Sequence, residues 1–165
     1  MAISEQDYHR VAALLGRNPR GLEAVAVADE LGRPQVIRVA SLVDEKPFPT
    51  LFWLVDPALC YRIDRAEAEG LIADFQGRVD ADQRLRDALG RDHLAYITLR
   101  DQCMSATVRA DLQSLGFADV LASRGVGGIA DFGRIRCLHT WYAAHLVVPN
   151  TIGRMLDEHW QNYPG

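Results

Sequence analysis

The segments with strand-like composition all precede the dipeptide Asp56-Pro57, and the pattern after it is helical. AVAVAD (24–29) and QVIRVAS (35–41) are valine-rich runs separated by the turn-like segment ELGRP. TLFWLVD (50–56) follows PFP, whose prolines suit a sheet edge or the start of a strand. Connections this short favour antiparallel pairing. The sequence therefore predicts an α+β fold: an N-terminal helix, a small antiparallel sheet over about 24–56, then a mainly helical C-terminal two-thirds.

Helix start and stop signals divide the remaining chain. Ser4 is placed to cap an N-terminal helix that ends at Gly16, and Asp56-Pro57 begins a helix that ends at Gly70. Further helices are expected over about 80–89, 92–115, 137–148 and 151–161. In the longest of them we expect one apolar stripe to be buried: Leu94, Ile97, Met104, Val108, Leu112 and Leu115.

Length and composition are those of one globular domain, expected to span residues 1–165. A net charge of -4 and a pI near 5.7 provide no basic footprint for nucleic acid. The three cysteines form no CxxC pair, which argues against a disulfide framework and for a reducing compartment. The N-terminus lacks the apolar run of a secretory signal, and no stretch has the length of a membrane-spanning helix. We therefore expect a cytoplasmic protein without a nucleic-acid or membrane partner.

The stretch CLHTWYAAHL (137–146) holds the densest group of chemically active side chains. His139 and His145 are six residues apart, so they point away from each other on a regular helix and do not chelate one metal ion. A metal site here would need an extended start to the helix or ligands from elsewhere, and no metal ligand is assigned from the sequence. Trp141 and His145 are expected to belong to a packing face.

Cys137 and His139 are the candidate catalytic residues. Cys137 follows Arg136 and is expected in the first turn of its helix, where the cation and the helix N-terminus would favour a thiolate. The alternative is that Cys137 is a small buried hydrophobic residue. His139 is the candidate acid/base group, because the ordinary pKa of histidine lies near neutrality.

The segment RGVGG (124–128) is the candidate anion-binding loop. Its flexible backbone N–H groups precede a helix and lie near arginines, which suits a phosphate or carboxylate. It lacks the ending of a P-loop and the spacing of a dinucleotide fingerprint, and the alternative is an ordinary surface turn. The candidate ligand-binding residues of this segment and its continuation are Arg124, Gly125, Gly127, Gly128 and Arg136.

His93, Tyr96 and Arg100 are spaced i, i+3 and i+7, so one helical face carries an acid/base group, a hydroxyl and a fixed cation. We take these three residues as further ligand-binding candidates. The alternative is a polar face turned to solvent.

The order of LGRNPRGLEAVA, PFPTLFWLVDP, RGVGG, CLHTWYAAHL and PNTIG resembles an uncharacterised bacterial family, domain of unknown function 501 (DUF501). The resemblance covers nearly the whole chain and implies no established activity. Many relatives carry cysteines where this chain has ELGR (30–33) and Val55-Asp56-Pro57, and a histidine at the position of Trp141. A zinc site shared by the whole family is therefore not expected. The parts retained here add Tyr142, Asn150 and Gly153 to the residues above, and Asn150 is taken as a ligand-binding candidate.

Three hypotheses of function follow. The first is a pocket for a small anionic, phosphorylated ligand at the RGVGG–CLH junction, with hydrolysis or group transfer as the reaction class if the protein is an enzyme. The second is a non-catalytic interaction module that presents PFPTLFWL, with Phe52 or Trp53 exposed. The third is a zinc-binding protein. The sequence leaves open the cofactor, the substrate, enzymatic activity itself, and assembly into a homo-oligomer or with a protein partner.

Overall fold

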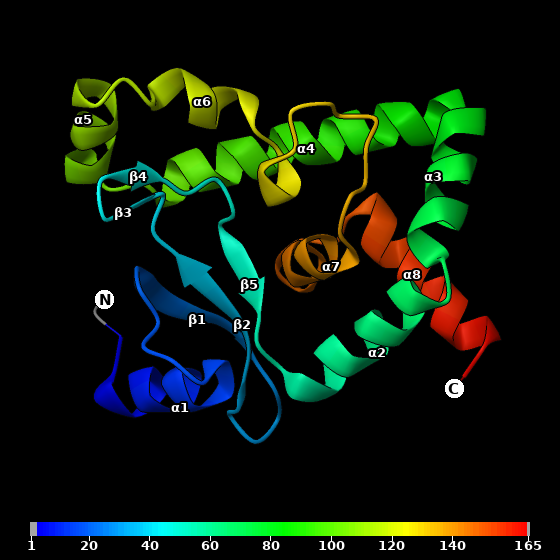
Figure 1. The fold of residues 1–165 in the computed structure, drawn as a ribbon, viewed down its shortest axis with the longest axis horizontal. Coiled ribbons are helices and arrows are strands. Elements are labelled where there is room, and N and C mark those ends of the chain that lie inside the picture. The colour runs from blue at the N-terminus through cyan, green and yellow to red at the C-terminus, as the bar shows by residue number, and fades with distance from the viewer. Residues whose placement is uncertain (1–2, 165) are drawn as a thin grey trace.

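The computed structural model describes residues 3–164 and has the predicted α+β architecture (Figure 1). A three-stranded antiparallel sheet has the order β1 (Leu22–Ala28), β2 (Pro34–Val39) and β5 (Phe52–Leu54). Between β2 and β5 the chain forms a short hairpin, β3 (Leu42–Val43) and β4 (Lys46–Pro47), which the sequence analysis did not predict. Each of its strands has only two residues, too few for an alternating pattern.

The two faces of the sheet are covered by different elements. Helix α1 (Glu5–Leu15) begins at Ser4, whose Oγ accepts a hydrogen bond from the Asp7 N–H, and ends at Gly16. Its buried Val11 belongs to a small core that includes Ile37 of β2. The neighbouring Val36 faces the other way, into the main core of the molecule. The sheet therefore separates a minor core from the larger helical part.

The helical part has more elements than the sequence analysis predicted. They are α2 (Pro57–Ala68), α3 (Leu71–Ala81), α4 (Gln83–Cys103), α5 (Ala106–Ser114), α6 (Ala118–Ser123), the short 3-10 helix η1 (Val126–Gly128), α7 (Leu138–Val147) and α8 (Thr151–Asn162). The predicted bounds of the helices over 80–89 and 92–115 are wrong, although both segments are largely helical. Helix α4 continues through Gly90, while Met104 is extended and Ser105 caps α5 by accepting a hydrogen bond from the Val108 N–H. A glycine is tolerated inside a long packed helix, whereas a serine that caps begins a new one.

The buried face of α4 is not the predicted apolar stripe. Leu94 is 58% exposed, while His93 and Arg100 are 0% and 1% exposed. The alternative interpretation, in which the polar residues of this face point to solvent, is therefore also wrong. His93, Tyr96 and Arg100 point inward because each of them forms a hydrogen bond with the backbone of a neighbouring segment.

Arg100 is a buried cation that binds backbone carbonyl groups. Its guanidinium donates to the carbonyl oxygens of Pro49 at 2.8 Å and Arg124 at 2.6 Å, and also to that of Leu121. These carbonyls belong to the segment before β5 and to the C-terminal end of α6. One side chain of α4 thus ties the sheet to the segment that leads into RGVGG.

Tyr96 makes the matching contact with backbone donors. Its hydroxyl oxygen accepts the Leu51 N–H at 2.6 Å and the Phe52 N–H at 3.4 Å. Burial raises the pKa of Tyr96 to about 12 although these hydrogen bonds oppose the effect, so the phenol stays neutral. Together Tyr96 and Arg100 determine where β5 begins.

Helix α7 lies in the centre of the molecule, between β5, α2, α4 and α8 (Figure 1). Trp141 is fully buried, and its indole N–H donates to the Ile135 carbonyl at 2.9 Å, which confirms its packing role. Among residues 3–164, no helix combines the length and the apolar character required to cross a membrane.

Replacing Arg100 by methionine should lower the free energy of unfolding by about 3 kcal/mol, because three buried or partly buried carbonyl groups lose their donors. The measurement is the midpoint of urea unfolding at unchanged slope. Arg91→Met is the matched control, since Arg91 is exposed on the same helix; we expect its effect to stay within about 0.5 kcal/mol. Equal stabilities of the two variants would contradict the role given to Arg100.

Candidate functional site

The start of α7 brings Cys137 and His139 together. Arg136 has a positive φ of 65°, which is uncommon for a residue other than glycine, and Cys137 is extended at φ -143° and ψ 125°. The helix itself begins at Leu138, so Cys137 is the N-cap residue and does not lie in the first turn as predicted. Within a regular helix, the side chains of residues two positions apart point in nearly opposite directions. Because Cys137 is extended and precedes the helix, its side chain can point the same way as that of His139. The Cys137 Sγ and the His139 Nδ1 are therefore only 3.8 Å apart.

Helix α2 contributes two carboxylates to this pair. The His139 Nε2 lies 2.9 Å from the Asp64 Oδ1, and the His139 Nδ1 lies 3.3 Å from the Glu67 Oε1. The same Glu67 oxygen accepts the Leu138 N–H at 2.8 Å. Neither residue was predicted from the sequence, because acidic residues three positions apart on a helix are usually solvated and their partners lie about seventy residues further along the chain.

Hydrogen bonds and charges within the cluster shift the pKa values of Cys137 and His139. Partial burial would raise the pKa of the Cys137 thiol, but hydrogen bonds from His139 and from the Thr140 backbone outweigh it and lower the pKa. The hydrogen bond with Cys137 and the charges of Glu67 and Asp64 raise the pKa of His139 to about 9, although burial acts in the opposite direction. The cluster therefore favours a thiolate beside a protonated imidazole.

Three atoms of the cluster have the arrangement of metal ligands. The Cys137 Sγ, the His139 Nδ1 and the Glu67 Oε1 lie within 4.8 Å of one another. A tetrahedral zinc ion has bonds of about 2.3 Å to sulfur and about 2.0 Å to nitrogen or oxygen. The edges of the tetrahedron, which are the distances between two ligand atoms, are then about 3.5 Å between sulfur and nitrogen and about 3.3 Å between nitrogen and oxygen. The observed edges are 3.8 Å between sulfur and nitrogen and 3.3 Å between nitrogen and oxygen. The two edges that meet at the His139 Nδ1 are thus close to those of a tetrahedral zinc site.

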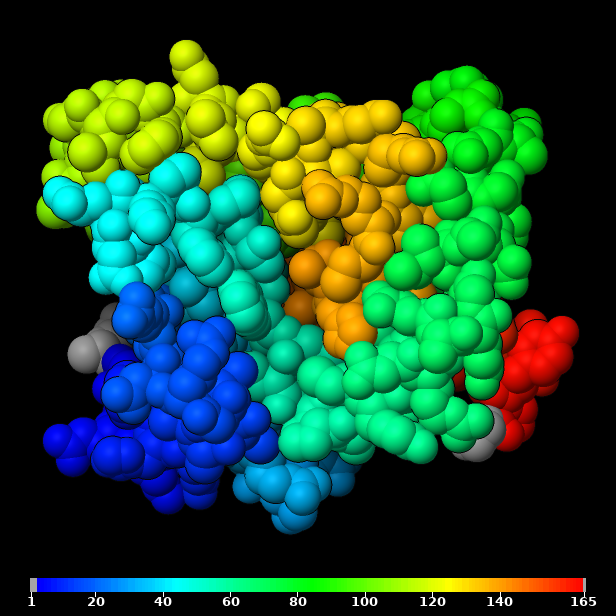
Figure 2. Space-filling model, in the orientation of Figure 1, coloured from blue at the N-terminus to red at the C-terminus, as the bar shows by residue number. Residues whose placement is uncertain are grey.

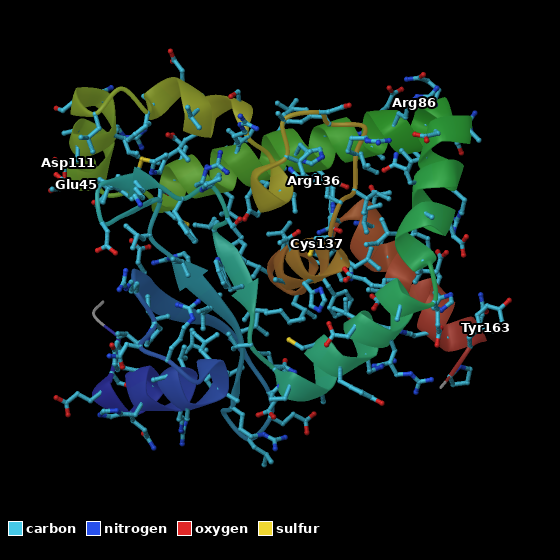
Figure 3. The ribbon with its side chains drawn as sticks, in the orientation of Figure 1. Glu45, Arg86, Asp111, Arg136, Cys137 and Tyr163 are labelled. Atoms are coloured by element: carbon cyan, nitrogen blue, oxygen red, sulfur yellow. The ribbon has the colours of Figure 1, made fainter. Side chains whose placement is uncertain are left out.

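A hollow adjoins this cluster on the side of β5. We call it the α7 hollow; it has a volume of about 320 Å³ and is lined by Thr50, Phe52, Trp53, Leu54, His139 and Thr140. Figure 2 shows the surface hollowed where the orange segment around the start of α7 meets the β5 and α2 segments. Figure 3 places Cys137 at the start of α7, just after Arg136. A small ligand in this hollow would therefore contact His139 of the cluster.

Most backbone donors of the RGVGG loop are already paired within the protein. The N–H groups of Gly125, Gly128 and Ile129 donate to carbonyl oxygens within the loop, and that of Val126 donates to the His93 Nδ1. Arg124 is half-buried and Arg136 is exposed. The hydrogen bonding of this loop therefore gives no support to anion binding by its backbone.

Gly125 has a packing role against His93. A Cβ at this position would lie 2.1 Å from the His93 Nδ1, so no other residue fits without a shift of the backbone. The His93 ring stacks on Phe132 at 4.6 Å, and its Nε2 has no hydrogen-bond partner among the described residues. Burial lowers the pKa of His93 to about 4, slightly opposed by Asp131. The structure thus holds His93 as a neutral ring that supports the loop.

Asn150 also has a structural position, at the start of α8. Its Oδ1 accepts the Gly153 N–H at 2.8 Å, and its amide donates to the Trp141 carbonyl at 2.8 Å. The His145 Nδ1 accepts the Asn150 N–H, while the His145 Nε2 pairs with Asp157 at 2.8 Å. Six of the predicted site residues therefore fall into two groups. Cys137 and His139 meet in the cluster, whereas His93, Tyr96, Arg100 and Asn150 hold the backbone around it.

Comparison with known proteins identifies a family and no activity. Residues 25–158 match the model of a family described as a protein of unknown function (DUF501). No curated protein and no solved structure matches the chain.

The stability of the protein should fall as the pH is lowered from 6.5 toward 4. The folded-state pKa of His93 lies below its ordinary value, so the contribution of the neutral ring is complete above pH 6.5 and is lost as the pH falls through about 4. The loss should be on the order of 3 kcal/mol, measured by urea unfolding at several pH values. His93→Gln should flatten this slope, whereas His9→Gln, at an exposed histidine of α1, should keep it. An unchanged slope in His93→Gln would contradict the assignment.

Proposed function

This chain belongs to the DUF501 family of proteins of unknown function, and we propose that it binds one zinc ion through Cys137, His139 and Glu67. The observation that carries the proposal is the convergence of a thiol, an imidazole nitrogen and a carboxylate oxygen within 4.8 Å. Thiolate, imidazole and carboxylate are the ligand types that zinc takes in proteins.

Each of the three ligands also has the second hydrogen bond that orients a metal ligand. The His139 Nε2 faces the Asp64 carboxylate, which would leave Nδ1 free to bind the metal. The Glu67 Oε1 is held by the Leu138 N–H. The backbone N–H groups of His139 and Thr140 stabilise the Cys137 sulfur as a thiolate, the form that binds zinc. These contacts support a metal site more than a chance meeting of polar side chains.

Three protein ligands leave one position of a tetrahedral zinc ion for water or substrate. The α7 hollow lies beside His139, so it supplies the space for a ligand at that position. An ion in this site would bind an anionic oxygen and would lower the pKa of a bound water. We therefore propose metal-assisted hydrolysis or group transfer on a small anionic ligand. The ion would thus take the anion-binding role that was predicted for the RGVGG backbone.

The purified protein should contain about one zinc ion per chain by elemental analysis. Cys137→Ser and His139→Ala should lose the ion, and Asp64→Asn should weaken zinc affinity by about 10- to 100-fold through loss of the contact to His139. Cys60→Ser is the matched control, because it makes the same substitution at a cysteine of the adjacent helix α2 that lies outside the three-atom group. A full equivalent of zinc in Cys137→Ser would refute the proposed ligand set.

A second candidate function uses the same residues without a metal ion. The Cys137 Sγ, the two nitrogens of His139 and the Asp64 carboxylate form a chain with separations of 3.8 Å and 2.9 Å. Nucleophile, base and orienting carboxylate are arranged in this way in thiol-dependent hydrolases and transferases. This candidate applies if the protein as purified is free of metal.

Alkylation by iodoacetamide distinguishes the two candidates. In chelator-treated protein, Cys137 should react faster than Cys60, because burial and the nearby carboxylates of Asp64 and Asp56 raise the pKa of Cys60. Stoichiometric zinc should protect Cys137 if the metal site is correct. Rapid alkylation of Cys137 with and without zinc would favour the thiol mechanism, and the modified cysteine is identified by peptide mass spectrometry.

A further inference from the structure

A second hollow lies beside the β3–β4 hairpin, outside the zinc cluster. We call it the hairpin hollow; it measures about 300 Å³ and is formed by the segment after α1, the strands β2 and β3–β4, and the residues Phe48 and Trp53. None of the proposed zinc ligands lines it. Its volume is at the lower end of the range for small-molecule sites.

The floor and one wall of the hairpin hollow are apolar. Ile37 and Val39 of β2 form the floor, and both are buried members of the minor core. The wall is the stacked pair Phe48 and Trp53, whose ring centroids are 5.6 Å apart with an interplanar angle of 17°. The two rings already order each other by stacking, so an aromatic ligand that contacts the pair does not have to immobilise them.

The rim of the hairpin hollow is cationic, although the chain as a whole has a net charge of -4. Arg17, Arg20 and Lys46 line it together with a single carboxylate, that of Asp44. Asp44 pairs with Arg20 at 2.8 Å, which leaves Arg17 and Lys46 as the uncompensated charges of the rim. Exposed cations beside an apolar floor suit a ligand with an apolar body and one anionic group.

The backbone fixes both sides of this rim. Gly16 ends α1 in the left-handed conformation, at φ 67°, and directs the chain toward Arg17. The hairpin turn has two residues other than glycine at positive φ, Asp44 at 50° and Glu45 at 61°. Figure 3 shows Glu45 at the tip of this hairpin, at the edge of the molecule. The exposed Asp44–Arg20 pair links this turn to the segment after α1.

We propose that the hairpin hollow is a second binding site, which takes an aromatic ring system carrying one anionic group. The rings lie against Phe48 and Trp53 over Ile37, and the anion lies between Arg17 and Lys46. The site uses none of the proposed zinc ligands, although Trp53 lines both hollows.

The test uses 8-anilinonaphthalene-1-sulfonate, which has fused aromatic rings and one sulfonate, and its uncharged relative N-phenyl-1-naphthylamine. The sulfonate should bind with one-to-one stoichiometry and more tightly than the uncharged probe, measured by fluorescence titration. Arg17→Ala/Lys46→Ala should weaken sulfonate binding about tenfold, because the two exposed cations that attract the sulfonate are removed. Binding of the uncharged probe should be unchanged in this variant.

Arg84→Ala/Arg91→Ala removes two exposed cations of α4 and should leave both affinities unchanged. Chelator-treated protein should bind the sulfonate as well as zinc-loaded protein does, which separates this proposal from the zinc site. Four results would each overturn the proposal. They are an equal loss of sulfonate affinity in the two double variants, no loss of sulfonate affinity in Arg17→Ala/Lys46→Ala, equal affinity for the two probes, and sulfonate binding that does not saturate.

Discussion

The burial of Arg100 is the constraint on which the arrangement of this protein depends. A guanidinium that is 1% exposed must have its N–H groups paired, and no carboxylate pairs with it among residues 3–164. The partners are backbone carbonyls from the segment before β5 and from the end of α6. Because an unpaired buried cation is costly, these two segments have little freedom to move relative to α4. The sheet and the helical part are thereby locked together.

The same helix face determines the path of the chain into the cluster. After Arg124, the loop is held by the His93 Nδ1 at Val126, by the tight packing of Gly125 on the His93 ring, and by the Trp141 indole at Ile135. The chain then reaches Cys137 with only Arg136 in between. The buried polar residues of α4 are therefore connected to the chemistry of the cluster through the backbone, without touching it.

The sequence was informative where local pattern decides the structure and uninformative where distant segments meet. Valine-rich runs, the cap at Asp56 and the terminating Gly16 specify the strands and two of the helix ends by local geometry alone. Cys137 and His139 could be recognised as candidates from their proximity in the chain, but Glu67 depends on how α2 packs against α7. The inward-facing polar residues of α4 were misread because amphipathic patterns assume that polar side chains face water, and this rule fails where buried backbone groups need partners.

The cluster depends on the residue at which α7 begins. If the helix included Cys137, its side chain and that of His139 would point about 200° apart and could not share an ion. The helix instead starts one residue later, and the carboxylate of Glu67 accepts the Leu138 N–H at that start. A carboxylate at this position also stabilises the positive end of the helix. Glu67 thus serves two purposes: it fixes the start of α7 and presents the same oxygen to the thiol and imidazole that this start brings together.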